Sequence, residues 1–362
     1  MGAGRIFISD CEGPISKNDN AFEVTQAFIP GGAPFYALIS RYDDVLADVI
    51  KPPGYRAGNT LKLIAPFLKA YGVTNETMVE FAAQTLVVLP GAREMLSHLT
   101  RILPSFIVST SYEQYLAALC AVMDFPVENT YCTRLDLDRY DVPPREAARL
   151  KEIQDEIASY PMIDIPDDAE SLQDFAENDQ AVIERLDTVF WEELPGMTCG
   201  RMLEDITPVG GEAKARVVME IVATLESALS DVVYVGDSIT DVQALQRVKE
   251  GGGVAISFNG NRYAVKNAEI AVLSDNALVT SVLVDVFYRR GKKAVLELAR
   301  RWSHGVLKTD ATSNALIESL LKQVPHALPQ VRVVDEADVE ELVGASNLFR
   351  KKVRGEAIGR LG

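Results

Sequence analysis

Short apolar runs alternate along this chain with longer segments in which apolar residues recur every three or four positions. The short runs begin near residues 5, 104 and 231, and their composition predicts buried strands. The longer segments predict helices at residues 21–28, 36–50, 60–71, 76–86 and 92–101. Leu61, Ile64, Ala65 and Leu68 show the helical spacing best, with Asn59 or Thr60 available as the N-cap. Polar residues follow each predicted strand, and these are the candidates for chemistry.

The first predicted strand ends in Asp10, Cys11 and Glu12, followed by a Gly-Pro turn. Because side chains alternate along a strand, Asp10 and Glu12 should point into one pocket while Cys11 points the other way into the core. Two carboxylates at one strand end can divide the roles of nucleophile and proton donor. An Asp-x-Glu-Gly run also occurs as an ordinary turn, so this motif alone does not decide the function.

Three further segments add chemistry in a fixed order. The second predicted strand ends in the hydroxyls of Ser109, Thr110 and Ser111, and Lys214 follows a Gly-Gly pair at the start of a predicted helix. The third strand ends in a glycine turn that carries Asp237 and, one helical turn later, Asp241. A lysine near a helix N-terminus is electrostatically unfavourable unless an anion lies close by, which favours an anion site over a surface lysine.

Acid pair, hydroxyl, lysine and second acid pair, in this order from Ile6 to about Asn261, resemble the four motifs of the haloacid dehalogenase (HAD) superfamily. The resemblance implies an α/β fold, a doubly wound parallel sheet with a Rossmann-like core and a helical cap. It implies a phosphatase in which Asp10 is the nucleophile, Glu12 the acid and base, Ser109 a phosphate donor and Lys214 a charge partner. It also implies Mg²⁺ bound by Asp10, Asp237 and the Glu12 backbone carbonyl, with Asp241 either a ligand, direct or through water, or only a helix cap.

Glu12 departs from the pattern, because most phosphatases of this superfamily carry aspartate there. The intrinsic acidities of the two side chains are close, about 4.3 against 3.9, so the change alters reach rather than proton chemistry. The resemblance disfavours other branches: a dehalogenase would need neither Asp237 nor Asp241, and a P-type ATPase or a phosphonatase would not carry glutamate at position 12.

The motifs divide the chain into four parts. Residues 1–19, 87–130 and 209–288 are expected to form the core, and residues 20–86 the helical cap. Residues 131–208 form a second, mainly helical insertion whose core-like positions include Phe175, Leu186, Phe190 and Trp191. Residues 289–362 form a C-terminal extension, with a short edge strand near Val331 and a short helix over residues 335–342.

Charge and composition limit the partners. The formal net charge is −16, which opposes binding to nucleic acid. Residues 161–194 hold eleven acidic residues and one basic residue, Arg185, so this stretch is either a solvated face or a docking surface for a basic protein. The four cysteines form no Cys-x-x-Cys pair, which indicates a cytoplasmic protein. The apolar stretches are too short for membrane insertion.

Two questions remain open from the sequence. The substrate should be a small phosphorylated metabolite, with Thr110, Ser111, Arg41 and Arg56 as candidate contacts. The chain also resembles an archaeal branch labelled energy-converting hydrogenase A subunit R, on the evidence of its first motif, the Ser-Thr-Ser-Tyr-Glu-Gln-Tyr-Leu run and the Phe258–Asn261 segment. That label suggests an alternative: a catalytically weak regulatory or assembly factor that docks on a protein complex through the acidic insertion or the basic residues of the C-terminal segment, Arg350, Lys351, Lys352 and Arg354.

Overall fold

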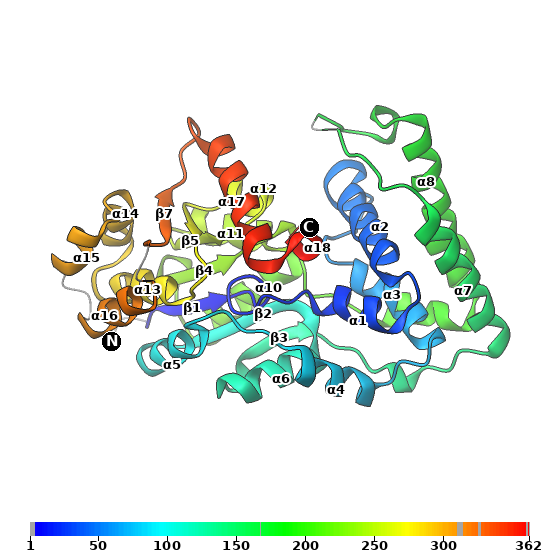
Figure 1. Cartoon of the computed structure of the whole chain (residues 1–362), viewed down its shortest axis with the longest axis horizontal. Helices are drawn as coiled ribbons and strands as arrows, with labels where there is room; N and C mark the ends of the chain where they lie inside the picture. The colour runs from blue at the N-terminus through cyan, green and yellow to red at the C-terminus, as the bar shows by residue number, and fades with distance from the viewer. Residues whose placement is uncertain (1–3, 167, 310–313, 325–326, 360, 362) are drawn as a thin grey trace.

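One sheet of seven strands organises the molecule (Figure 1). The computed structural model describes residues 4–166, 168–309, 314–324, 327–359 and 361. The strands are β1 (Ile6–Ser9), β2 (Ser105–Tyr112), β3 (Thr130–Thr133), β4 (Val232–Gly236), β5 (Val254–Phe258), β6 (Ile270–Leu273) and β7 (Gln330–Val333). Their order is β3-β2-β1-β4-β5-β6-β7, and only β7 runs antiparallel to its neighbour. The expected doubly wound α/β core is confirmed.

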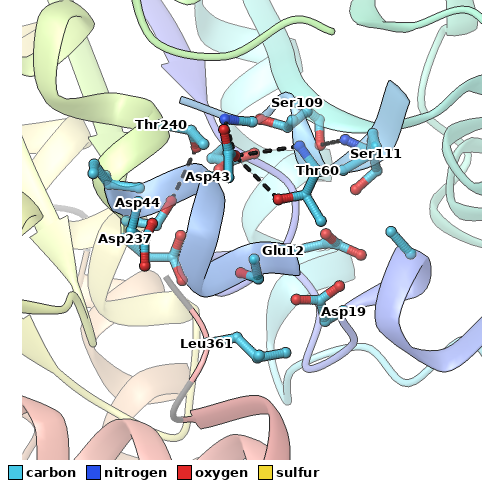
Figure 2. Close-up of a pocket in the computed structure, with 18 of the residues that line it drawn as sticks. Glu12, Asp19, Asp43, Asp44, Thr60, Ser109, Ser111, Asp237, Thr240 and Leu361 are labelled. Atoms are coloured by element: carbon cyan, nitrogen blue, oxygen red, sulfur yellow. Dashed lines mark hydrogen bonds between the residues drawn. The ribbon is translucent and has the colours of Figure 1, made fainter. Parts of the chain in front are cut away.

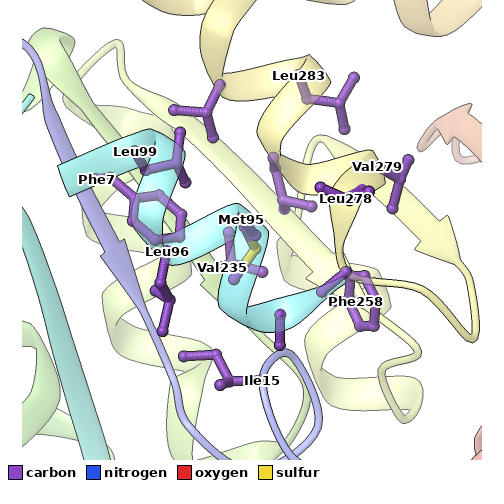
Figure 3. Close-up of a cluster of buried hydrophobic side chains, with 14 of the residues drawn as sticks. Phe7, Ile15, Met95, Leu96, Leu99, Val235, Phe258, Leu278, Val279 and Leu283 are labelled. Atoms are coloured by element: carbon purple, nitrogen blue, oxygen red, sulfur yellow. The ribbon is translucent and has the colours of Figure 1, made fainter. Parts of the chain in front are cut away.

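The strands are buried on both faces, which explains why they read as continuous apolar runs rather than alternating ones. Phe7, Val233 and Val235 face a large apolar cluster shared with helices α5 (Ala92–Ile102), α6 (Glu113–Met123) and α13 (Leu278–Arg290) (Figure 3). Ile6, Ile8, Val232 and Tyr234 face the opposite layer. That layer consists of α10 (Glu212–Thr224), α11 (Val242–Glu250) and α12 (Arg262–Asn267). The alternation places Cys11 in the first cluster, as expected from the motif.

The cap follows β1 and returns before α5. Its helices are α1 (Asn20–Phe28), α2 (Gly32–Asp44), the π-helical η1 (Val45–Ile50), α3 (Thr60–Ala70) and α4 (Asn75–Thr85). These bounds lie close to the ranges expected from apolar spacing. Asp19 caps α1 by accepting from the Phe22 backbone N–H, and Thr74 caps α4 in the same way through Thr77.

The second insertion packs on the cap rather than forming a separate body. Its longer helices are α7 (Pro144–Ser159) and α8 (Glu177–Thr188), followed by the short helix α9 (Arg201–Asp205). Apolar residues of α2, α3, α7 and α8 share one buried cluster, and the helices lie side by side in Figure 1. Phe175, Leu186 and Phe190 are buried as expected, but Trp191 is 40% exposed. Trp191 lies outside the core because its ring lines a cavity and its indole N–H donates to Tyr42.

The C-terminal extension continues the core. Its elements are α14 (Lys292–Arg300), α15 (His304–Thr309), α16 (Asn314–Gln323), β7, α17 (Val339–Arg354) and α18 (Glu356–Gly359). The expected edge strand near Val331 is present as β7, paired with β6. The expected short helix over residues 335–342 is wrong, because the helix begins at Val339 and continues to Arg354. Buried Leu342 and Val343 pack it on Val265, Ala271 and Leu273.

Among the described residues, no helix combines the length and the apolar character that crossing a membrane requires. The four cysteines are all unpaired thiols.

Candidate active site

The predicted motif residues meet at the carboxyl ends of three adjacent strands. Asp10 follows β1, Asp237 follows β4, and Ser109 lies on β2, on the other side of β1. Ligands of open parallel sheets bind beyond this edge. These three side chains line a single cavity of about 100 Å³, and Lys214 reaches Asp10 from α10. Segments far apart in the sequence therefore converge on one site.

Ser109 is exposed to this cavity because the sheet changes at its position. The pairing of β2 with β1 ends at Ile107, and the register between β2 and β3 shifts between Val108 and Tyr112. Such an irregularity redirects side chains at the sheet edge. The Ser109 hydroxyl accepts the backbone N–H of Ser111 at 3.2 Å, and the buried hydroxyl of Ser111 has no hydrogen-bond partner among the described residues.

A buried charge network joins the motifs. Lys214 is fully buried, and its ammonium donates to Asp10 Oδ2 at 2.6 Å and to Asp241 Oδ1 at 2.8 Å. Burial opposes the positive charge, but Asp10 and Asp241 together raise the pKa of Lys214 above its ordinary value. Burial raises the pKa of Asp10, and Lys214 counteracts that rise. The lysine is therefore held charged against the first-motif carboxylate.

Both oxygens of Asp241 are committed to the protein. Oδ1 accepts from Lys214 and from the Tyr234 hydroxyl at 2.6 Å. Oδ2 accepts the backbone N–H groups of Asp237 and Ser238 at 3.0 and 3.1 Å, which closes the turn after β4. Asp241 thus serves as a cap and as the second anchor of Lys214, two of the functions that a residue in this position can have.

Glu12 lies on the cap side of the cavity, close to Asp19 (Figure 2). Its Oε1 accepts the backbone N–H of Asn20 at 2.6 Å, at the start of α1. Burial raises the pKa of Glu12 well above its ordinary value, and the neighbouring charge of Asp19 raises it further, while Arg354 acts in the opposite direction. The protonated form of Glu12 is therefore favoured at a higher pH than for an exposed glutamate.

Two arginines of the C-terminal extension enter the site. Arg350 and Arg354 both donate to Asp237 Oδ2, Arg354 at 3.0 Å, and all three side chains are at most 4% exposed. The sequence shows them as part of a basic segment, which suggested a docking surface. Their spacing of four residues does place them on one helix face, but no local pattern indicates which carboxylate they would meet.

The cap closes the cavity from above. Asp43 accepts from the Tyr55 hydroxyl and the Gly58 N–H, each at 2.8 Å, and from the Thr60 hydroxyl at 3.1 Å. These bonds hold the loop before α3 against the core. A Cβ on Gly58 would lie 2.9 Å from Thr110 Cγ2, and a Cβ on Gly210 would lie 2.3 Å from the Ala57 carbonyl oxygen. The glycines of the lysine motif therefore allow the cap loop to approach.

The candidate substrate contacts divide into two pairs. Thr110 and Ser111 line the cavity, whereas Arg41 and Arg56 do not. Arg41 is excluded because Tyr36, Ser40, Asp43 and Asp44 occupy the face of α2 that is turned to the site. Arg56 lines a different cavity of about 650 Å³, between the cap loop and the second insertion, together with Tyr55, Lys62 and Trp191.

The carboxylates form a set that suits a hard divalent cation. Oxygen atoms of Asp10, Asp237 and Asp241 lie within 4.8 Å of one another, and all three residues are buried. Oxygen donors of this type and number fit Mg²⁺, which keeps water in its remaining positions. Because the described donors reach only Oδ2 of Asp237, its other oxygen is available to a cation.

Comparisons with solved structures agree with this architecture. A gene product of Archaeoglobus fulgidus is similar over 99% of both chains, with 28% identity and a TM-score of 0.79. A phosphoserine phosphatase in apo form aligns at 13% identity and a TM-score of 0.46, over 80% of this chain and 100% of its own. A HAD family hydrolase from Salmonella enterica serovar Typhi aligns at 13% identity and a TM-score of 0.41, over 71% of this chain and 62% of its own.

No protein-family model and no curated protein matches the sequence. None of the three solved structures is described as a hydrogenase component, so the resemblance to that archaeal branch gains no support. The first similarity covers the C-terminal extension as well as the core, because it spans 99% of this chain.

Proposed function

We propose that this protein is a Mg²⁺-dependent phosphomonoester hydrolase of the haloacid dehalogenase type, acting through Asp10 on a small phosphorylated metabolite. The observation that carries the proposal is the convergence of Asp10, Ser109 and Asp237 on one cavity, with Lys214 bonded to Asp10 at 2.6 Å. Each residue comes from a different segment, and each supplies a group that phosphoryl transfer requires.

In the first step, an Asp10 carboxylate oxygen attacks phosphorus as the bond to the leaving alcohol oxygen breaks. Glu12 gives its proton to that oxygen, which leaves as a neutral alcohol. In the second step, Glu12 takes a proton from water, and the water oxygen attacks phosphorus. The aspartyl-phosphate is cleaved, inorganic phosphate leaves, and Asp10 is free again. The raised pKa of Glu12 supports its starting state as the acid.

The site must reduce the repulsion between a carboxylate and a phosphate. Each pair of unit charges at about 3.5 Å costs about 5 kcal/mol at an effective dielectric of about 20. Lys214 provides one positive charge beside Asp10. Ser109 is assigned to the phosphoryl oxygens as a hydroxyl donor, with the backbone N–H groups of Thr110 and Ser111 nearby. Asp10 and Asp237 would hold Mg²⁺, which would supply further positive charge at the phosphoryl group.

Closure of the cap supports the same chemistry. Asp43 and its loop shield a cavity of only about 100 Å³, and exclusion of water strengthens every electrostatic contact within it. A cavity of this size suits a phosphoryl group and a small leaving group. We therefore assign substrate choice to the cap residues around the site, among them Tyr36, Ser40 and Asp44.

The test compares an aryl phosphate with an alkyl phosphate, each with Mg²⁺ and with a chelator. Asp10→Asn should abolish turnover of both while the fold is kept, as judged by circular dichroism. Glu12→Gln should reduce alkyl phosphate turnover by about 10²- to 10⁴-fold, and aryl phosphate turnover less, because a phenolate needs no proton to leave. Asp275→Asn is the matched control, since Asp275 follows β6 at the same sheet edge but lies outside the cavity.

Two results would contradict the proposal. One is metal-independent turnover; the other is turnover that survives in Asp10→Asn. Absence of turnover on a broad panel of phosphorylated metabolites, in a folded protein that binds Mg²⁺, would favour a binding or regulatory role instead.

A further inference from the structure

We propose that helix α17 and a divalent cation compete for Asp237, so that docking of the C-terminal segment restrains metal loading of the active site. This inference rests on the metal site of the proposed function. It assigns a role to the C-terminal extension that the catalytic steps do not require.

The competition begins with shared ligand atoms. Arg350 and Arg354 both donate to Oδ2 of Asp237, and Arg350 also donates to the Asp237 carbonyl oxygen at 3.2 Å. Asp237 is at the same time a member of the carboxylate group that suits Mg²⁺. The guanidinium groups therefore already neutralise the charge that would attract the cation.

The seat of α17 on the core explains how the arginines reach this position. Leu342 is fully buried in an apolar cluster with α12 and β6, and the Ser346 hydroxyl donates to the Gly260 carbonyl oxygen at 2.6 Å. Ser346, Arg350 and Arg354 follow at intervals of four residues and share one helix face. That face is directed at Asp237, and Figure 1 shows α17 and α18 between the sheet and the cap.

The same segment contacts the crossing between core and cap. Arg354 Nε donates to the Lys17 carbonyl oxygen at 3.1 Å, and its Nη2 donates to that of Asn18. Asn18 in turn accepts the Val87 N–H at 2.7 Å, so the outgoing and returning chains of the cap are joined at this point. Leu361 lines the cavity, and its carbonyl oxygen accepts from Arg350. Withdrawal of α17 would therefore free both Asp237 and the base of the cap.

Electrostatics determines the direction of the coupling. Two guanidinium groups and a divalent cation around one buried carboxylate repel one another strongly, because the surroundings screen them poorly. The buried Nε of Arg350 has no hydrogen-bond partner among the described residues. Docking thus leaves one donor unsatisfied, and exposing the side chain to water would satisfy it. The cation and the docked helix should each weaken the other, to the same degree.

An opposite role makes an opposite prediction. If the arginines only oriented Asp237 for the metal, their removal would weaken Mg²⁺ binding. If they compete with the metal, removal would strengthen it. The sign of the change in affinity distinguishes the two roles without any measurement of turnover.

The experiment measures Mg²⁺ binding by calorimetry in the full chain. Arg350→Gln/Arg354→Gln should bind Mg²⁺ at least about tenfold more tightly than the wild type. Lys351→Gln/Lys352→Gln removes the same charge from the same helix without touching Asp237 and should change the affinity less than about twofold. Leu342→Ala keeps both arginines and weakens only the seat of the helix, so it should also tighten binding.

Hydrogen exchange gives a second measurement. Saturating Mg²⁺ should accelerate exchange of residues 339–359 in the wild type, and Asp237→Asn should abolish that response. Equal or weaker Mg²⁺ binding by both the arginine variant and Leu342→Ala, or exchange unchanged by Mg²⁺, would overturn the competition alone. Absence of Mg²⁺ binding in every variant would overturn the metal site of the proposed function together with it.

Discussion

The ammonium of Lys214 lies 2.6 Å from the Asp10 carboxylate and is fully buried. The pair joins the lysine motif to the first strand across more than 200 residues of chain. A buried charge keeps its ionised form only when it is paired and hydrogen-bonded. The position of Lys214 therefore depends on the two carboxylates around it, and theirs on Lys214.

Lys214→Met tests this dependence. The methionine fills a similar volume but leaves Asp10 and Asp241 buried without a cation. Removing one partner of a buried ion pair costs about 3–5 kcal/mol, so the free energy of unfolding in urea at neutral pH should fall by this amount. Lys266→Met is the control, because Lys266 pairs with an exposed glutamate, and it should cost less than about 1 kcal/mol. Equal effects of the two substitutions would show that the buried network contributes no more than a surface pair.

Gly210→Ala tests the contact between cap and core. The added Cβ would lie 2.3 Å from the Ala57 carbonyl oxygen, so the cap loop must move away from the site. We expect kcat/KM on an active substrate to fall by about 10- to 100-fold, because small displacements of positioned groups are costly. Hydrogen exchange in residues 52–60 should become faster. Gly196→Ala, which meets no atom within 4 Å, should leave both measurements unchanged; a normal kcat/KM in Gly210→Ala would show that cap closure is not required.

Glu23 predicts a pH dependence of stability. Burial raises its pKa to about 7, although Asn18 donates to both carboxylate oxygens. The folded state therefore keeps a proton that the unfolded state loses near its ordinary pKa of 4.5. Where the folded state binds more protons, stability falls as pH rises, so Glu23 should lower stability progressively between about pH 4.5 and 7, the window set by these two values.

The measurement compares urea unfolding of wild type and Glu23→Gln across this range. The wild type should lose stability relative to the variant as pH rises, with a slope of at most about 1.4 kcal/mol per pH unit, and less because the side chain is only partly buried. Glu80→Gln, on the exposed face of α4, is the control and should track the wild type. Parallel curves for wild type and Glu23→Gln would exclude a raised pKa at this position.

The sequence by itself determined the parts of the site whose signals are local. Asp10 and Asp237 each follow an apolar run long enough to form one buried strand, and Lys214 follows a glycine pair that opens a helix. Because parallel strands end at one edge of a sheet, strand ends predict a shared site without knowledge of the contacts. The apolar spacing of the cap helices predicted their positions for the same local reason.

Only the tertiary structure decided what surrounds these residues. Arg350 lies 113 positions from Asp237, and a basic helix face looks the same in sequence whether it meets solvent or a carboxylate. Arg41 and Trp191 were misjudged in the same way, since residue type and spacing define a helix face but not its neighbour. Long-range contacts depend on how separate elements pack, and packing is set by the combined shape and charge of surfaces that no single segment contains.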